Sequence, residues 1–195
     1  MRKRLAEVKL SPSILVRAAT HTDWPRIRAL CCLTGDNGNP IEESRWESFG
    51  EKWIAPYETL LPEWAFVAET EGKIVGYLTG CPNSAAFRES ARPRFSLPQL
   101  AVEERFAAAT RARLDREFPA HLHVNLEAPA RGAGIGKMLL DAFVARLRAV
   151  KTPGLHVFCG AEPLAYYLKN GFRELDRLET KLGVFAHAMV KNLEP

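Results

Sequence analysis

The stretch Arg131-Gly-Ala-Gly-Ile-Gly-Lys137 constrains this chain more than any other, because three glycines join a strand to a helix there. The run His121–Leu126 before it alternates polar and apolar residues as a strand does, and residues 138–148 carry apolar residues at helical spacing. Such a turn leaves backbone N–H groups unpaired at the positive end of the helix dipole. Because glycine has no side chain to block close approach, the stretch predicts a site for a diphosphate group.

Two other glycine motifs are excluded by spacing. A P-loop requires Gly-x-x-x-x-Gly-Lys-Ser/Thr, whereas Arg131 stands in place of the first glycine and Met138 in place of the hydroxyl residue. A dinucleotide fingerprint requires Gly-x-Gly-x-x-Gly near the start of a βαβ unit, which the Gly-x-Gly-x-Gly spacing here does not supply. The pattern that fits is Arg/Gln-x-x-Gly-x-Gly/Ala, and the alternative is a glycine-rich helix start without a ligand.

Length and composition predict one soluble domain over residues 1–195, with a flexible leader over residues 1–12. No apolar run approaches the ~20 residues that a bilayer span needs, so no membrane partner is expected. The net charge of +4 is dispersed and forms no basic stripe, which argues against a nucleic-acid partner. The cysteines have no zinc or redox spacing, so reduced thiols in a cytoplasmic protein are expected, and no metal site.

The order of expected elements is βααββ, an insert of one or two helices, and then βαβαββ. A helix is expected over about residues 41–53, a hairpin over 64–80, and closing strands over 172–175 and 184–192. This order predicts an α/β (α+β) fold, in which a mixed sheet carries helices on both faces.

The segment from His121 to Leu175 resembles the cofactor half of the GCN5-related N-acetyltransferases (GNAT). It carries Arg131-x-x-Gly134-x-Gly136 and, at the expected distance, Tyr167-x-x-x-Gly171-Phe172. Several shorter pieces are similar to a bacterial branch related to the acetyltransferase-like domain of O-GlcNAc hydrolases: residues 32–38, 55–57, 76–77 and 122–126. The resemblance implies a mostly antiparallel central sheet whose two parallel strands splay apart at the cofactor site.

The resemblance also implies acetyl-CoA as the cofactor and assigns the residues that bind it. The pantetheine arm is expected along the backbone of Val124, Asn125 and Leu126. The diphosphate is expected on the backbone N–H groups of the glycine turn, with Arg131 and Lys137 adding charge or remaining solvated cations. The turn residues implied are Arg131, Gly132, Ala133, Gly134, Ile135, Gly136 and Lys137.

Tyr167 takes the position of the family's general acid, which protonates the thiolate that leaves when an amine attacks the thioester. The alternative is an aromatic residue that only packs, and the neighbouring Tyr166 is out of register with Gly171 and Phe172. The chain departs from the family at Gly160, where many relatives carry an asparagine that contacts the cofactor.

A general base is assigned less directly. Period-2 alternation puts His121, His123 and Asn125 on one face of a strand, and His123 has suitable chemistry near neutral pH. Glu127, Asp36 and an ordered water relay are the alternatives.

The leading prediction is an N-acetyltransferase that uses acetyl-CoA in a direct ternary complex with a small-molecule or peptide amine. A non-catalytic acyl-CoA-binding or protein-interaction module is the alternative, and a homodimer is open to either. Five acidic residues lie where relatives place the acceptor, and they would either attract a cation or form a solvated helix face: Asp36, Glu42, Glu43, Glu47 and Glu51.

Overall fold

The computed structural model describes residues 13–193, so the leader expected over residues 1–12 lies outside the described range. Its centre is one seven-stranded sheet in the order β1-β2-β3-β4-β5-β7-β6. Every neighbouring pair is antiparallel except β4 and β5. The strands are β1 (Ile14–Ala18), β2 (Phe66–Thr70), β3 (Lys73–Cys81), β4 (Ala120–Leu126), β5 (Gly154–Cys159), β6 (Arg173–Lys181) and β7 (Val184–Asn192).

The parallel pair is short. β4 and β5 pair only at Ala120–Leu155 and His121–His156. From Leu122 onward β4 stays paired with β3 but has left β5, so its other edge carries backbone groups without a strand partner. The expected splayed parallel strands in a mixed, mostly antiparallel sheet are therefore confirmed.

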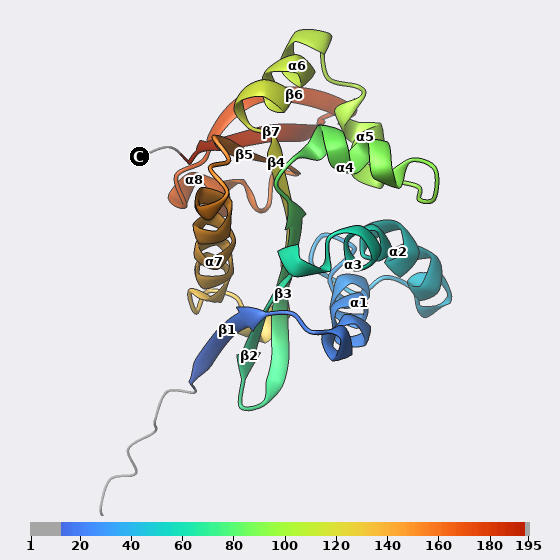
Figure 1. The fold of residues 1–195 in the computed structure, drawn as a ribbon. Coiled ribbons are helices and arrows are strands. Elements are labelled where there is room, and N and C mark those ends of the chain that lie inside the picture. The colour runs from blue at the N-terminus through green and yellow to red at the C-terminus, as the bar shows by residue number, and fades with distance from the viewer. Residues whose placement is uncertain (1–12, 194–195) are drawn as a thin grey trace, which may run out of the picture.

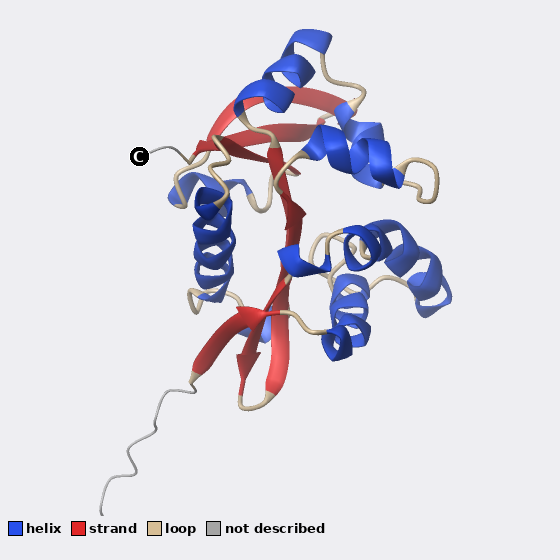
Figure 2. Ribbon diagram, viewed as in Figure 1, coloured by secondary structure: helices blue, strands red, loops and turns tan. Residues whose placement is uncertain are grey.

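Helices cover both faces of the sheet (Figures 1 and 2). The long helix α7 (Ile135–Ala149) and the short α8 (Leu164–Lys169) lie on one face, where Leu139 and Phe143 join the main hydrophobic core. On the other face, α1 (Trp24–Leu33), α2 (Trp46–Trp53) and α3 (Ala55–Leu60) cover β3 and β4. The insert forms α4 (Ser84–Ala91), α5 (Pro98–Glu103) and α6 (Ala108–Glu117) beside them, where Phe106 packs on Ala188 of β7.

The two faces of the β3–β4 pair differ in chemistry. Toward α7, the cross-strand neighbours are apolar, as at Leu78 and Val124. Toward α1–α3, three successive pairs carry polar side chains: Tyr77 with Asn125, Thr79 with His123, and Cys81 with His121. We call these three pairs the polar ladder. One period-2 pattern thus builds a core on one side and a polar surface under helices on the other.

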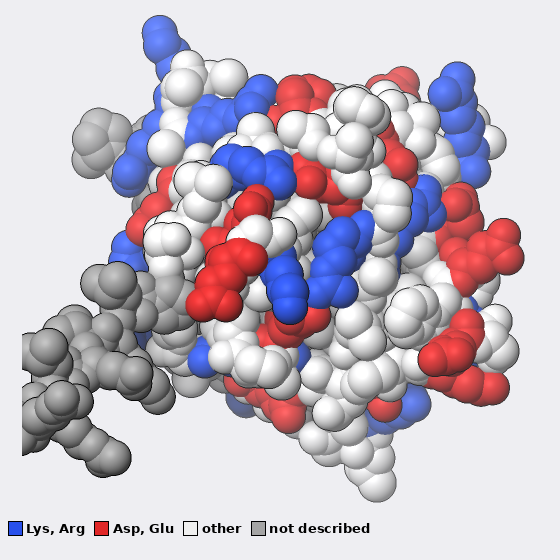
Figure 3. Space-filling view, turned by 90° about the horizontal axis from the view of Figure 1, so that it is seen from below, with Lys and Arg blue, Asp and Glu red and all other residues white. Residues whose placement is uncertain are grey.

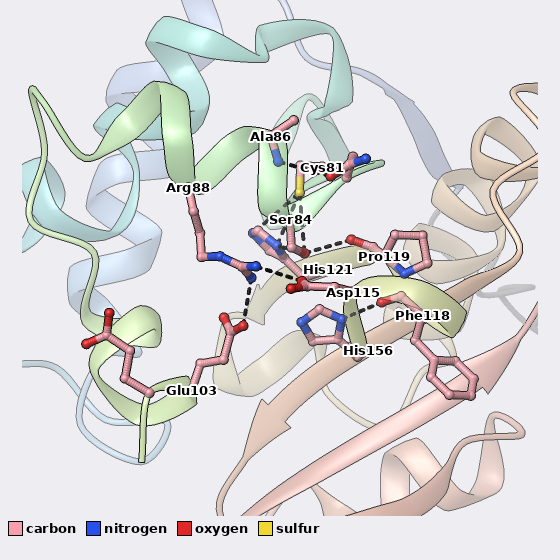
Figure 4. Close-up of polar contacts among 12 residues, drawn as sticks. Cys81, Ser84, Ala86, Arg88, Glu103, Asp115, Phe118, Pro119, His121 and His156 are labelled. Carbon is pink, nitrogen blue, oxygen red and sulfur yellow. Dashed lines mark hydrogen bonds and ion pairs between the residues drawn. The ribbon is translucent and has the colours of Figure 1, made fainter. Parts of the chain in front are cut away.

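Two expectations about helices need correction. The helix expected over residues 41–53 begins only at Trp46, after a 3-10 turn at Glu43–Arg45, and the separate helix α3 follows it. The insert has three helices instead of one or two. Arg88 of α4 joins them with ion pairs of 2.7 Å to Glu103 of α5 and 2.7 Å to Asp115 of α6 (Figure 4), a contact between distant residues that periodicity does not reveal.

Candidate functional site

The glycine turn has the backbone that its sequence predicts. Gly132 and Gly134 have φ angles of +81° and +82°, in the left-handed region that favours glycine. A Cβ atom at either position would meet nothing within 4 Å, so open space lies in front of the turn. Ala133 between them is exposed. The turn therefore leaves room for a ligand against the backbone itself.

The amides of this turn are available to a ligand. Within residues 13–193, the backbone N–H groups of residues 132–137 donate no hydrogen bond, and the first to do so is Met138, to the Gly134 carbonyl at 3.1 Å. Helix α7 begins at Ile135, so the positive end of its dipole points the same way. Unbonded amides, open space and a helix start together suit a diphosphate group.

Gly136 has a different reason to be glycine. A Cβ there would lie 3.1 Å from Leu126 and 3.2 Å from the ring of Tyr166. The hydroxyl of Tyr166 donates a 2.8 Å hydrogen bond to the Gly136 carbonyl. This close contact fixes the start of α7 against α8, which also carries Tyr167.

The two cations of the motif are engaged by protein groups. Arg131 donates to the carbonyls of Leu126 at 3.1 Å and Gly38 at 2.8 Å, which ties the turn to the loop after α1. Lys137 pairs with Asp141 at 2.5 Å on the exposed face of α7. Their charges lie beside the turn, but both side chains have partners in this structure.

The edge of β4 that faces the gap between β4 and β5 belongs to Val124, Asn125 and Leu126. These residues pair with Leu78, Tyr77 and Gly76 of β3, and β5 has already diverged from them. Their backbone groups on the gap side can therefore pair with an extended ligand, as an added strand would.

Tyr167 lies on the α7 side of this gap. Its side chain is 5 % exposed and packs in the main core, 5.2 Å from Phe172 and 5.1 Å from Tyr166 between ring centroids. Burial raises the pKa of its hydroxyl far above the ordinary value, and Cys159 and Tyr166 add to the rise. The hydroxyl makes no hydrogen bond to the described part of the chain, so it is a protonated donor without a partner.

His123 lies on the opposite side of the sheet from Tyr167. The ring centroid of Trp53 lies 5.3 Å from that of His123, and the Asn125 amide lies 3.2 Å from its Nε2 atom. Its Nδ1 atom is buried and has no partner among the described residues. Burial lowers the pKa of His123 to about 4, so the ring is neutral at pH 7.

His121 lies two residues earlier on the same face, but both of its ring nitrogens are bonded; Figure 4 shows it beside Ser84 and Cys81. Ser84 Oγ donates to the Pro119 carbonyl at 2.7 Å and accepts from His121 Nδ1 at 2.7 Å. Tyr57 Oη donates to His121 Nε2 at 2.8 Å. Burial lowers the pKa of His121 well below its usual range, so it is a neutral structural residue.

The other base candidates are less suited. Glu127 forms an ion pair with Arg26, and Asp36 lies in the loop after α1. Among the acidic residues expected near an acceptor, Glu47 and Glu51 line a cleft of about 440 Å³ between α2 and residues 94–96. Glu51 pairs with Arg28 at 2.9 Å, and Arg94 lies across the same cleft.

The thiols are poor nucleophiles. Burial raises the pKa of Cys31, Cys81 and Cys159 to about 12 each. Within residues 13–193 no group of His, Cys, Asp and Glu residues could hold a metal ion, and no helix is long and apolar enough to cross a bilayer.

Gly160, the departure from the family pattern, lies just after β5. A Cβ atom there would meet nothing within 4 Å, so no packing contact requires a glycine. Sequence reasoning also missed Thr79, which is paired with His123 across β3 and β4 and has a buried hydroxyl; the alternation of β3 gave a signal for it. On the face seen from below, basic and acidic side chains are interspersed, with a short basic group near its middle (Figure 3).

Comparisons with known proteins agree with this geometry. The model of a family described as "Acetyltransferase (GNAT) family" matches residues 38–172. A structure named SsHAT has a TM-score of 0.75 at 23% identity and covers 94% of this chain and 100% of its own. An agmatine N-acetyltransferase mutant gives 0.61 at 18% identity, with coverage of 92% and 99%. The putative acetyltransferase yncA of Salmonella typhimurium, solved with acetyl-CoA, gives 0.57 at 16% identity, with coverage of 93% and 94%.

Proposed function

The chain belongs to the acetyltransferase (GNAT) family, and on this premise we propose that it transfers an acetyl group from acetyl-CoA to an amine. The acceptor is a small molecule or a peptide, bound at the same time as acetyl-CoA. One observation carries the proposal: the unbonded amides of residues 132–137 stand next to the gap where β4 and β5 part. A phosphate site and an extended slot of this kind suit the diphosphate and the pantetheine arm of one cofactor.

Different residues bind different parts of the cofactor. The backbone of Gly132, Ala133, Gly134, Ile135, Gly136 and Lys137 holds the diphosphate, and the edge of Val124, Asn125 and Leu126 holds the pantetheine arm. Arg131 positions the turn through its bonds to Leu126 and Gly38. When bound, acetyl-CoA supplies a thioester whose carbonyl carbon is open to an amine and whose sulfur leaves as a thiolate.

Two protons have to move, and the proposal assigns one to each side of the sheet. His123 receives the proton that the acceptor ammonium must lose before its nitrogen can attack. Tyr167, which burial keeps protonated, gives its hydroxyl proton to the departing sulfur. The two residues lie on opposite faces of the sheet, and the proposal places the reacting thioester between them, in the gap between β4 and β5. Protonated thiols agree with direct transfer rather than an acyl-cysteine route.

The first experiment separates binding from catalysis. Calorimetry with CoA measures binding, and liquid chromatography follows acetyl-CoA consumption with a panel of amines and peptides. Binding with turnover supports the proposal. Binding without turnover on any acceptor favours the non-catalytic module, and absence of binding overturns both.

A charge placed in the turn tests the cofactor site. Ala133→Glu adds a carboxylate among the free amides at an exposed position where no left-handed backbone is required. Ala145→Glu puts the same charge on an exposed position of α7, away from the start of that helix. We expect CoA affinity to fall by on the order of 100-fold in the first variant, because charge repulsion and lost amide bonds add. Equal affinity of the two variants would contradict this assignment.

A further inference from the structure

The middle pair of the polar ladder differs from the pairs on either side of it. In the first pair, the Asn125 amide donates to the Tyr77 hydroxyl at 3.0 Å. In the third, His121 is bonded through both ring nitrogens. In the middle pair, Thr79 Oγ1 and His123 Nδ1 are both buried, and neither has a hydrogen-bond partner in the described part of the chain.

These two atoms belong to side chains that face each other. Thr79 and His123 are directly paired across β3 and β4, and such pairs have Cβ atoms ~4.5–5.5 Å apart. Thr79 is fully buried, so bulk water does not reach its hydroxyl. Buried polar atoms are almost always bonded, and where protein supplies no partner an ordered water usually does.

We propose that Thr79 Oγ1 and His123 Nδ1 share one buried water molecule, and that Thr79 is a positioning residue acting through this water. The hydroxyl and the ring nitrogen give the water two polar partners on the face of the sheet that α1–α3 cover, where the proposed function places the acceptor. The water site itself is independent of the reaction, whereas its role in proton transfer rests on the proposed function.

The proton transfer through this site is balanced. The acceptor ammonium gives one proton to the water, and the water gives one of its own to the lone pair of His123 Nδ1. The ring then carries a hydrogen on both nitrogens, and the water is regenerated. Thr79 changes no bond; its hydroxyl only holds the water in line.

Asn125 decides whether Nδ1 has that lone pair. With the amide N–H pointing at Nε2, the ring hydrogen is on Nδ1. The proton transfer therefore requires the amide turned by half a turn, so that its oxygen accepts from both Nε2 and the Tyr77 hydroxyl and Nδ1 has the lone pair. The side chains that contact the ring, Trp53, Tyr77 and Asn125, are uncharged at neutral pH, so no salt bridge competes for the proton.

The test compares three variants of buried threonines. Thr79→Val keeps the shape and removes the hydroxyl, whereas Thr79→Ser keeps the hydroxyl. Thr152→Val removes a buried threonine hydroxyl beyond the far end of α7 and controls for a general loss of packing. Folding of each variant is checked by thermal unfolding.

Two readouts do not depend on activity. Nitrogen-15 NMR follows the His123 ring, assigned by its loss in His123→Gln, and a high-resolution crystal structure shows whether density lies between the two atoms. We expect water density in the wild type and in Thr79→Ser. In Thr79→Val the density should be lost and the Nδ1 signal should shift, while Thr152→Val should match the wild type. Wild-type density that shows a direct Thr79–His123 hydrogen bond, or an unchanged Nδ1 signal in Thr79→Val, would overturn the proposal.

Turnover measurements test the proposed role of Thr79 in proton transfer. Thr79→Val should lower turnover about threefold to tenfold, the size of one lost hydrogen bond, without weakening CoA binding. Thr79→Ser should restore it. A turnover loss in Thr79→Val with the Nδ1 signal and density unchanged would show that Thr79 does not act through the water. If the wild type acetylates no amine, the proposed function fails, while the NMR and the density still decide the water site.

Discussion

The candidate site contains two pairs of like residues, and in each pair the protein bonds one member fully and leaves the other open. His121 and His123 lie on one face of β4, and Tyr166 and Tyr167 are adjacent on α8. His121 uses both ring nitrogens, and Tyr166 donates to the Gly136 carbonyl. His123 Nδ1 and the Tyr167 hydroxyl have no hydrogen-bond partner within residues 13–193.

In both pairs the residue with the proposed chemical role has fewer protein partners than its neighbour, although the two are alike in residue type and burial. A proton added to His121 would go to Nε2, which already accepts from Tyr57, so the neutral form is held by its bonds. With the Asn125 amide turned so that its oxygen accepts from Nε2, His123 has Nδ1 free for such a proton. Both rings are buried and both pKa values are lowered, so neither property distinguishes them.

The largest contrast is expected between the two tyrosines. Tyr167→Phe removes the proposed proton donor and keeps the packed ring, so turnover should fall by on the order of 10²–10⁴-fold with CoA affinity nearly unchanged. Tyr166→Phe removes the bond to Gly136 and should lower the free energy of unfolding by about 1 kcal/mol. Steady-state kinetics and thermal unfolding of both variants measure the contrast.

Either of two results would break this contrast. Wild-type turnover in Tyr167→Phe would remove its role as the acid. Parallel losses of turnover and CoA affinity in Tyr167→Phe would instead assign it to positioning.

The second-largest contrast is expected between the two histidines. His123→Gln should lower turnover by about 100-fold, the lower end of what a general base contributes, with little change in stability. His121→Gln should do the reverse, because Ser84 and Tyr57 each lose their bond to the ring: stability should fall by about 1–3 kcal/mol, while the folded protein keeps its turnover. Chemical denaturation and kinetics on the same samples test this. Equal turnover losses in both variants would argue that the polar ladder acts as one unit.

How far the sequence predicts these roles depends on how far apart along the chain the contacting residues lie. Alternation in β4 predicts His121, His123 and Asn125 on one face, and the register of the sheet confirms it. Spacing from Gly171 selects Tyr167 over Tyr166 as the acid, and that choice stays a prediction. The partners come from elsewhere in the chain. Tyr57 and Ser84 reach His121 from α3 and α4, and Gly136 reaches Tyr166 from α7. Periodicity carries no information on such pairings, so it could not separate the bonded from the open residue.

The same reason explains the errors in the fold. Most strands and α7 follow from local patterns of alternation and helical spacing and lie within a few residues of their predicted bounds, whereas β6 continues to Lys181, well beyond its predicted end at residue 175. The three-helix insert depends on Arg88 meeting Glu103 and Asp115, which lie 15 and 27 residues away. Gly38 likewise has a partner far along the chain, since Arg131 lies against it 93 residues later, and its φ of +86° favours glycine there.

The smallest expected effect is on how the free energy of unfolding changes with pH, and it should be the same for His121 and His123. Burial lowers the pKa of His123 and His156 to about 4 and that of His121 well below 6.5. Above pH ~6.5 neither the folded nor the unfolded chain holds these protons, so they contribute nothing. As the pH falls from ~6.5 to ~4, the unfolded chain binds protons that the folded chain does not, and stability is lost by about 1.4 kcal/mol per pH unit for each histidine.

His121→Gln and His123→Gln should each remove one such histidine and flatten the curve of unfolding free energy against pH by the same slope. The exposed His21 supplies His21→Gln as the matched control for the substitution itself. Denaturant unfolding between pH 7 and pH 4.5 measures the slopes. Equal slopes together with unequal turnover would show that burial sets the proton affinity of both rings and that their bonding partners set what each does. A flattened slope in His121→Gln alone would mean that His123 exchanges protons with solvent in the folded state, and its role as a buried base would have to be abandoned.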